Sequence, residues 1–120
     1  MVCNNRPPSF PEGLDLEIFS FKALKAAQNN AASQFEREHV TPWLYSEGAG
    51  LNVFNLSYYQ NKSHIRLTVD TVEDMQLARK LCEHFGEEYL FGTEEVIGYI
   101  EKNQSLLQIN QQVSRSDLYR

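Results

Sequence analysis

The chain has 120 residues, enough for one ordinary domain or part of one. Hydrophobic residues make up 42% of it and charged residues 22%, which excludes extended disorder except near its ends. The net charge is -5 and the pI about 5.1. Nucleic-acid binders usually carry a basic stripe, and the lysines and arginines form none here, so we expect no nucleic-acid partner.

Neither a membrane span nor a secretory leader is predicted. No apolar run approaches the length of a bilayer span, and residues 1–8 lack the apolar centre of a signal peptide. Cys3 and Cys82 do not have metal-binding spacing; they favour a reducing compartment, and we expect Cys82 in the core. The sequence therefore predicts a cytoplasmic protein without a membrane partner.

A strand and a helix are predicted after a turn-rich opening. Residues 6–13 contain three prolines and a glycine, which leave little room for a regular element. Residues 14–18 alternate apolar and acidic side chains, the period of a strand. Ser20 is a suitable N-cap for a helix over 21–32, a run of good helix formers.

The middle of the chain predicts a short helix and a second strand. Ser33 and Glu36 have the spacing of a capping box, which opens a helix toward residue 40. Pro42 should interrupt this helix because its ring clashes with the preceding turn. Residues 46–50 read as a loop, and residues 51–56 as a strand.

Residues 64–70 form the clearest predicted strand, followed directly by the best predicted helix, over 71–85. Gly86 suits the position after the helix. The expected buried stripe, at helical spacing, is Val72, Met75, Ala78, Leu81, Cys82 and Phe85, widened by Leu77.

A last helix should begin at Thr93 and bury Val96, Ile97 and Ile100. Leu106, Leu107 and Ile109 are expected to anchor the segment that follows. We expect residues 1–110 to form the folded portion and 111–120 a flexible tail. The order of elements predicts an α/β class with a small sheet, and so few strands indicate a piece of a larger fold.

Asp70 is the strongest candidate for chemistry. It lies at the end of a predicted strand and before a helix N-terminus, the edge where ligands bind in open α/β sheets. There a carboxylate could hold a cation beside helix amides that favour anionic oxygens. The same residues also suit a helix cap, as Asp70 with Glu73 or Thr71 with Asp74.

Two further groups are candidates for binding polar ligands. Asp15 and Glu17 share one face of a predicted strand, where paired carboxylates can accept hydrogen bonds from hydroxyls. Arg37 and His39 lie in one helical turn, where a guanidinium can hold an anion and an imidazole can titrate near neutral pH. From spacing alone, a solvated strand face for the first group and surface ion pairing for the second are the simpler explanations.

Three segments, taken together, resemble the spore-coat polysaccharide cytidylyltransferases, relatives of the acylneuraminate cytidylyltransferases. They are PEGLDLEIFS at 11–20, EREHVTPW at 36–43 and RLTVDTVED at 66–74. The similarity runs from about residue 2 to residue 109, in the order of that family's carboxyl-terminal half.

The resemblance implies a partial Rossmann-like nucleotidyltransferase fold, commonly dimeric. The parent reaction joins the α-phosphate of CTP to a sugar hydroxyl with Mg²⁺ and releases pyrophosphate. Asp70 matches the family's late metal-ligand aspartate. Asp15, Glu17, Arg37 and His39 fall in the region that would line the sugar pocket.

The sequence departs from the family pattern in one respect. The opening strand, the basic glycine-containing phosphate loop and the aspartate that supplies the first metal ligand are absent from these 120 residues. Phosphate sites depend on such amides and cations, so we expect this polypeptide alone to be inactive. The missing strands should also leave an exposed sheet edge, which tends to pair with another chain, so we expect dimers or larger assemblies. The alternatives are a non-catalytic sugar-binding or assembly module derived from that family, and an independent α/β domain.

Overall fold

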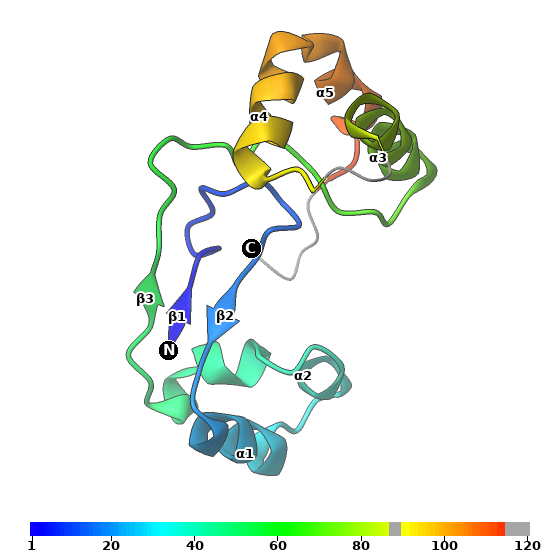
Figure 1. The fold of residues 1–120 in the computed structure, drawn as a ribbon. Coiled ribbons are helices and arrows are strands. Elements are labelled where there is room, and N and C mark those ends of the chain that lie inside the picture. The colour runs from blue at the N-terminus through cyan, green and yellow to red at the C-terminus, as the bar shows by residue number, and fades with distance from the viewer. Residues whose placement is uncertain (87–89, 115–120) are drawn as a thin grey trace.

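A computed structural model describes residues 1–86 and 90–114. The molecule is elongated, 45 × 29 × 27 Å, with a group of helices at each end and strands between them (Figure 1). The first lobe contains α1 (Phe21–Asn30), α2 (Gln34–Glu38) and two 3₁₀ segments (Pro42–Tyr45 and Glu47–Ala49). The second lobe contains α3 (Val72–Phe85), α4 (Thr93–Lys102), a 3₁₀ segment (Gln104–Leu106) and α5 (Leu107–Asn110).

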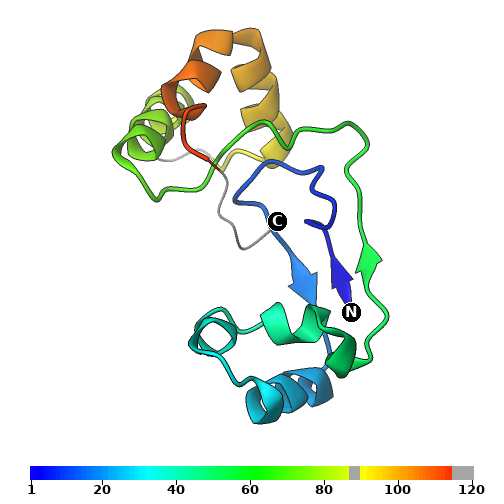
Figure 2. The same ribbon diagram turned by 180° about the vertical axis from the view of Figure 1, so that it is seen from behind.

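A small mixed sheet joins the two lobes (Figure 2). Its strands are β1 (Val2–Cys3), β2 (Glu17–Ile18) and β3 (Phe54–Asn55), in the order β2-β1-β3. The central strand β1 runs antiparallel to β2 and parallel to β3. The predicted α/β class, with a small mixed sheet and flanking helices, is confirmed.

The strands differ from those predicted in extent and number. β2 and β3 occupy only two residues each of the predicted strands 14–18 and 51–56. The predicted strand 64–70 is wrong, because this segment makes only one isolated bridge, between Glu12 and Arg66. Strand β1 was not predicted, since two residues are too few to show alternation.

The first lobe follows its local signals. Ser20 caps α1 by accepting a hydrogen bond from the Ala23 amide at 3.2 Å. The capping box between Ser33 and Glu36 is present, although α2 ends two residues before residue 40. Pro42 begins a 3₁₀ segment, as its steric demands require. The small core of this lobe consists of Ala23, Ala27 and Leu44, with Met1, Phe19, Trp43 and Leu51 packed against it.

The second lobe holds the larger core, and Leu77 and Leu81 are buried as predicted, but the rest of the predicted stripe is only partly buried on α3. Its inward face carries Asp74, Leu77 and Leu81, whereas Val72, Met75 and Cys82 are exposed. The expectation that Cys82 is buried is therefore wrong. The cause is Asp74, which faces inward to a buried arginine. The core residues are Ile65, Leu77, Leu81, Val96, Ile97, Ile100 and Leu106, so the predicted burial in α4 is confirmed.

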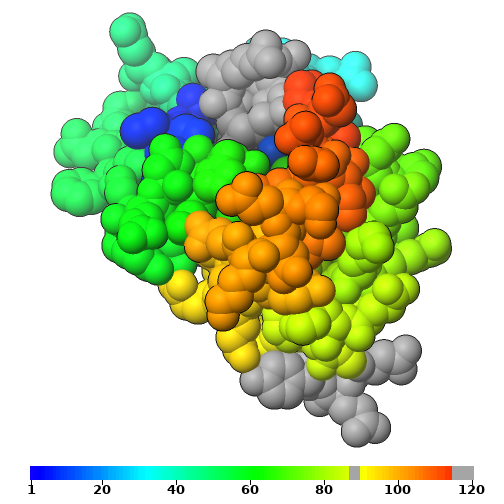
Figure 3. Space-filling model, turned by 90° about the horizontal axis from the view of Figure 1, so that it is seen from above, coloured from blue at the N-terminus to red at the C-terminus, as the bar shows by residue number. Residues whose placement is uncertain are grey.

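The segment before residue 65 runs along α4 in the view from above (Figure 3). Three side-chain contacts fix it there: Tyr58 and Tyr59 donate to Glu94, and Lys62 pairs with Glu101. The hydrogen bond to Glu94 raises the pKa of Tyr58. The connection between the sheet and α3 is thus tied to the second lobe before α3 begins.

Among the residues described, no helix has the length and apolar character to cross a membrane. The predicted tail at 111–120 lies partly outside the described residues, which end at 114. Within them, a turn closes after α5, where the amide of Val113 donates to the carbonyl of Asn110 at 3.0 Å.

Candidate functional site

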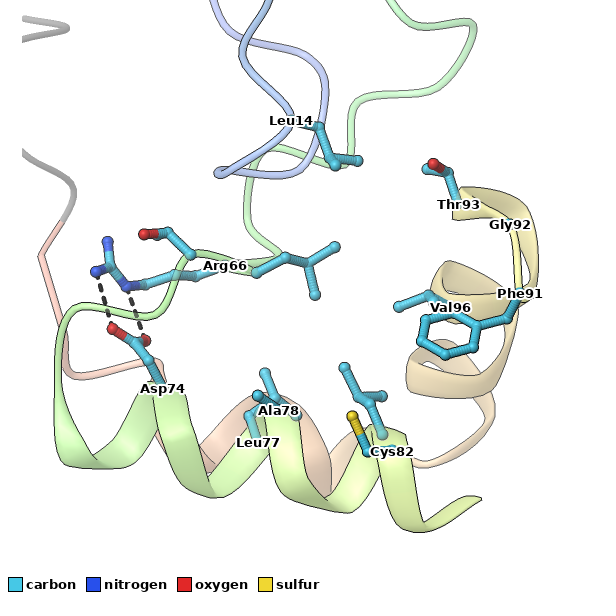
Figure 4. Close-up of a pocket in the computed structure, with 13 residues that line it drawn as sticks. Leu14, Arg66, Asp74, Leu77, Ala78, Cys82, Phe91, Gly92, Thr93 and Val96 are labelled. Carbon is cyan, nitrogen blue, oxygen red and sulfur yellow. Dashed lines mark hydrogen bonds and ion pairs between the residues drawn. The ribbon is translucent and has the colours of Figure 1, made fainter. Parts of the chain in front are cut away.

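A buried arginine lies at the centre of the candidate site. The Arg66 guanidinium donates to Asp74 through Nε and Nη2, at 2.9 and 3.0 Å, and to Glu12 through Nη1 at 2.6 Å. Its Nη2 also reaches Oδ2 of Asp70 at 2.9 Å. Figure 4 shows the forked contact with Asp74. Arg66, Glu12 and Asp74 are all buried, whereas the side chain of Asp70 is 67% exposed.

Backbone pairing places Glu12 beside this arginine. The amide of Glu12 donates to the carbonyl of Ile65, and its carbonyl accepts from the amide of Leu67, both at 2.8 Å. Gly13 allows this close approach: its φ is +99°, and a Cβ there would lie 2.8 Å from the backbone nitrogen of Thr68. The segment Pro11–Gly13, part of the family resemblance, thus serves to hold Glu12 against Arg66.

Asp74 links the arginine to the N-terminus of α3. It accepts hydrogen bonds from the amides of Asp70 and Thr71, both at 3.1 Å, and from Nδ2 of Asn110 at 2.8 Å. The hydroxyl of Thr71 accepts from the Asp74 amide in return, which completes a capping box. The Arg66 guanidinium, helped by these donors, holds the pKa of Asp74 well below its usual range, and the contact raises the pKa of Arg66.

These contacts decide between the two predicted caps. The cap of α3 is Thr71 with Asp74, so Asp70 stands outside it, at the rim of the second lobe. Oδ2 of Asp70 accepts from Arg66 and, at 2.8 Å, from the hydroxyl of Thr68. Its second oxygen, Oδ1, has no hydrogen-bond or ion-pair partner within the described part of the chain.

The site fits a magnesium ion only in part. Within residues 1–86 and 90–114, no three His, Cys, Asp or Glu side chains lie together as a metal site would need. One carboxylate oxygen suits a Mg²⁺ ion that is shared with another carboxylate, phosphates and water. The residues present therefore fit part of such a site and do not form one by themselves. The predicted role of Asp70 stays a prediction.

A cavity of about 270 Å³ lies next to the buried ion pair (Figure 4). It opens between α3, the start of α4 and the segment after Arg66. Most of its wall is apolar, and the polar groups at its edge are those of Arg66, Thr68, Asp74 and Thr93. Cys82, which is exposed and lies outside the core, lines this cavity beside apolar side chains.

Glu17 of β2 makes a specific contact with the first lobe. It accepts a hydrogen bond from the hydroxyl of Tyr45, and the Arg6 guanidinium lies 3.9 Å from the centre of the Tyr45 ring. Burial, followed by the bond to Glu17, raises the pKa of Tyr45. The side chain of Asp15 is exposed. The hydrogen bond from Tyr45 thus orients Glu17, whereas a carboxylate on a solvated strand face would need no such partner.

Arg37 and His39 lie in the first lobe, at the opposite end of the molecule from Asp70 (Figure 1). Arg37 is exposed on α2, and His39 follows α2 with its ring 4.8 Å from that of Phe35. Glu36, in the same turn, serves as the capping partner of Ser33, whose hydrogen bonds lower its pKa. The structure therefore does not bring Arg37 and His39 together with Asp70.

The sequence reasoning missed the buried part of the site. Arg66 and Asp70 are only four residues apart in the sequence, and this short separation was a usable signal for their contact. Glu12 lies 54 residues from Arg66, and Asn110 lies 36 residues from Asp74. Pairs so distant in sequence leave no local pattern.

The fold and the site together define a mixed α/β chain with an aspartate anchored before a helix at the edge of the molecule. Its structure is similar to that of a cytidylyltransferase from Leptospira borgpetersenii, with a TM-score of 0.82 and 28% identity. That match covers 95% of this chain and 47% of the other. The predicted cytidylyltransferase-like fold is thereby supported over nearly the whole chain.

A sequence relative is likewise about twice as long as this chain. The chain is 37% identical over 110 residues to an uncharacterised protein of Methanocaldococcus jannaschii, covering 90% of this chain and 44% of the relative. No protein-family profile matches the sequence. The chain spans about half the length of each of these two proteins.

Proposed function

We propose that this chain is the carboxyl-terminal portion of a sugar cytidylyltransferase for surface or spore-coat polysaccharide synthesis. In this reaction a sugar hydroxyl attacks the α-phosphate of CTP, a phosphorus–oxygen bond forms to the sugar, and pyrophosphate leaves. The observation that carries the proposal is an anchored Asp70 within a chain that matches a solved cytidylyltransferase over 95% of its length.

Asp70 is proposed as a ligand of Mg²⁺. The buried Arg66 fixes Oδ2 of Asp70, and Thr68 donates to the same oxygen, so that a cation could take up Oδ1 without breaking either contact. When bound, Mg²⁺ would offset the negative charge of the triphosphate. Because the chain is acidic and offers one such carboxylate, we expect it to need the rest of the fold for nucleotide binding.

Strand β2 and the first lobe are proposed to face the sugar. Glu17 of β2, oriented by Tyr45, could accept hydrogen bonds from sugar hydroxyls, and Asp15 is exposed two residues earlier in the chain. Arg37 on α2 and His39, directly after α2, would contribute from the first lobe. A cytoplasmic location and a homodimer or higher oligomer are also part of this proposal.

The test joins this chain to the unmatched portion of the Methanocaldococcus relative in one polypeptide. Pyrophosphate release is then measured with CTP, Mg²⁺ and a panel of sugar acceptors. Asp70→Asn should reduce turnover by about 100-fold or more, because even residues that only support metal ligands contribute 10–100-fold. Glu73→Gln, an exposed carboxylate in the first turn of the same helix, is the matched control and should leave turnover within about twofold.

Calorimetric titration of the chain alone with CTP and Mg²⁺ should give no micromolar binding. Equal turnover of the Asp70→Asn and Glu73→Gln proteins would reject the metal role. A joined protein that binds sugars but transfers no CMP would favour the non-catalytic module.

A further inference from the structure

One face of the sheet exposes a row of apolar side chains across all three strands. Val2 of β1 is paired in register with Ile18 of β2 and with Phe54 of β3. Residues opposite each other in a ladder project to the same side, so these three side chains share a face. Ile18 is 58% exposed and Phe54 76%, and Val2 is exposed as well.

The same face continues along the outer strands. Leu16 and Leu56 lie two residues from Ile18 and Phe54, and side chains two apart in an extended strand point to the same side. Both leucines are exposed. The amide of Leu56 still donates to the carbonyl of Cys3, at 2.7 Å, so the extended pairing reaches this residue.

The opposite face of the sheet is covered. Cys3, next to Val2, is fully buried, and its Sγ lies 3.5 Å from Oδ1 of Asn55. Glu17 on this side contacts Tyr45 of the first lobe. A sheet with a parallel pair such as β1 and β3 normally has both faces covered, because each face is then a hydrophobic surface that must exclude water.

We infer that the face formed by Val2, Leu16, Ile18, Phe54 and Leu56 docks the rest of the cytidylyltransferase fold. The match to the Leptospira enzyme uses 95% of this chain and 47% of the other, so about half of that fold has no counterpart in these 120 residues. The occupant is a polypeptide with an apolar surface that covers the sheet, either continuous with this chain or separate. The inference rests on the proposed function only for the choice of partner.

The experiment mixes this chain with the unmatched portion of the Methanocaldococcus relative, produced as a separate polypeptide and also by co-expression. Light scattering and calorimetry should show a complex with one copy of each. Ile18→Lys and Phe54→Lys, on opposite edge strands, should each weaken binding by about tenfold or more, because a desolvated central contact contributes at least 2 kcal/mol.

Leu90→Lys is the control, since Leu90 is 98% exposed and lies outside the sheet, in the segment before α4. It should leave the affinity unchanged. Circular dichroism checks that each variant keeps its helices, and the two substitutions on different strands give independent readings.

Failure to form a complex, or a complex indifferent to both substitutions in the sheet, would overturn the inference. So would a dimer of this chain that Phe54→Lys dissociates, because a second copy would then occupy the face. A complex that forms, while the joined polypeptide transfers no CMP, rejects the proposed function and leaves the docking intact.

Discussion

Replacing Arg66 with methionine would leave two buried carboxylates without their counter-charge. Glu12 and Asp74 each accept from the guanidinium and are buried, whereas Asp70 could turn to water. Removing one partner of a buried ion pair typically costs about 3–5 kcal/mol, and methionine restores packing but not charge. With a typical urea dependence of about 2 kcal/mol per molar, the unfolding midpoint should fall by roughly 2 M.

The assay is urea unfolding followed by circular dichroism, with Asp70→Asn as the control. That substitution affects only contacts of an exposed carboxylate, to Arg66 and to the hydroxyl of Thr68, so its cost should stay below about 1 kcal/mol. Equal costs for the two substitutions would refute the view that the buried contacts of Arg66 hold the second lobe together.

The effect of Arg66→Met should also depend on pH. In the native chain, the pKa of Asp74 is lowered from 3.8, so its stabilising contribution is complete above that pH and is lost as the pH falls through the folded pKa. Without the arginine, burial would instead favour protonation of the two carboxylates. The gap between native chain and variant should therefore shrink between pH 7 and pH 4. A constant gap over this range would contradict the electrostatic explanation.

Three further outcomes are expected. Gly13→Ala should destabilise the chain by about 1–3 kcal/mol in urea unfolding, because its φ is positive and the added Cβ would meet the Thr68 backbone; an unchanged midpoint would contradict this close approach. Asn110→Ala should cost about 1–3 kcal/mol by removing a buried donor to Asp74, and a neutral result would mean that water replaces it. In an alkaline absorbance titration, Tyr45→Phe should remove part of the signal that appears above pH 10 in the native chain; an unaltered late signal would show that this hydroxyl ionises normally.

The sequence predicted helix starts correctly where the capping side chain and the amide that it satisfies lie within one turn of helix. The cap at Ser20, the capping box that begins at Ser33, and the start of α4 at Thr93 all depend on side chains within about four residues of the amides they satisfy. Such contacts depend on neighbours in the chain and not on residues elsewhere in the fold. The sequence could therefore predict most helices and the α/β class without any knowledge of packing.

The orientation of α3 shows why apolar spacing alone was insufficient. Leu77 and Leu81 of the predicted stripe are buried, but Val72, Met75 and Cys82 of the same stripe are exposed. The buried partner of Asp74 accounts for the difference. An ion pair and a cap must be satisfied together, which turns the polar side chain of Asp74 inward and leaves one side of the predicted stripe in solvent.

The sequence by itself determined the helices with their caps and the position of Asp70 before a helix N-terminus. Only the tertiary structure decided that Asp70 is anchored by Arg66, and that Glu12 and Asn110 complete the buried network. It also decided that one face of the sheet is left exposed. Capping needs only neighbours in the chain, whereas buried charge pairs and sheet faces depend on residues that folding brings together from distant positions.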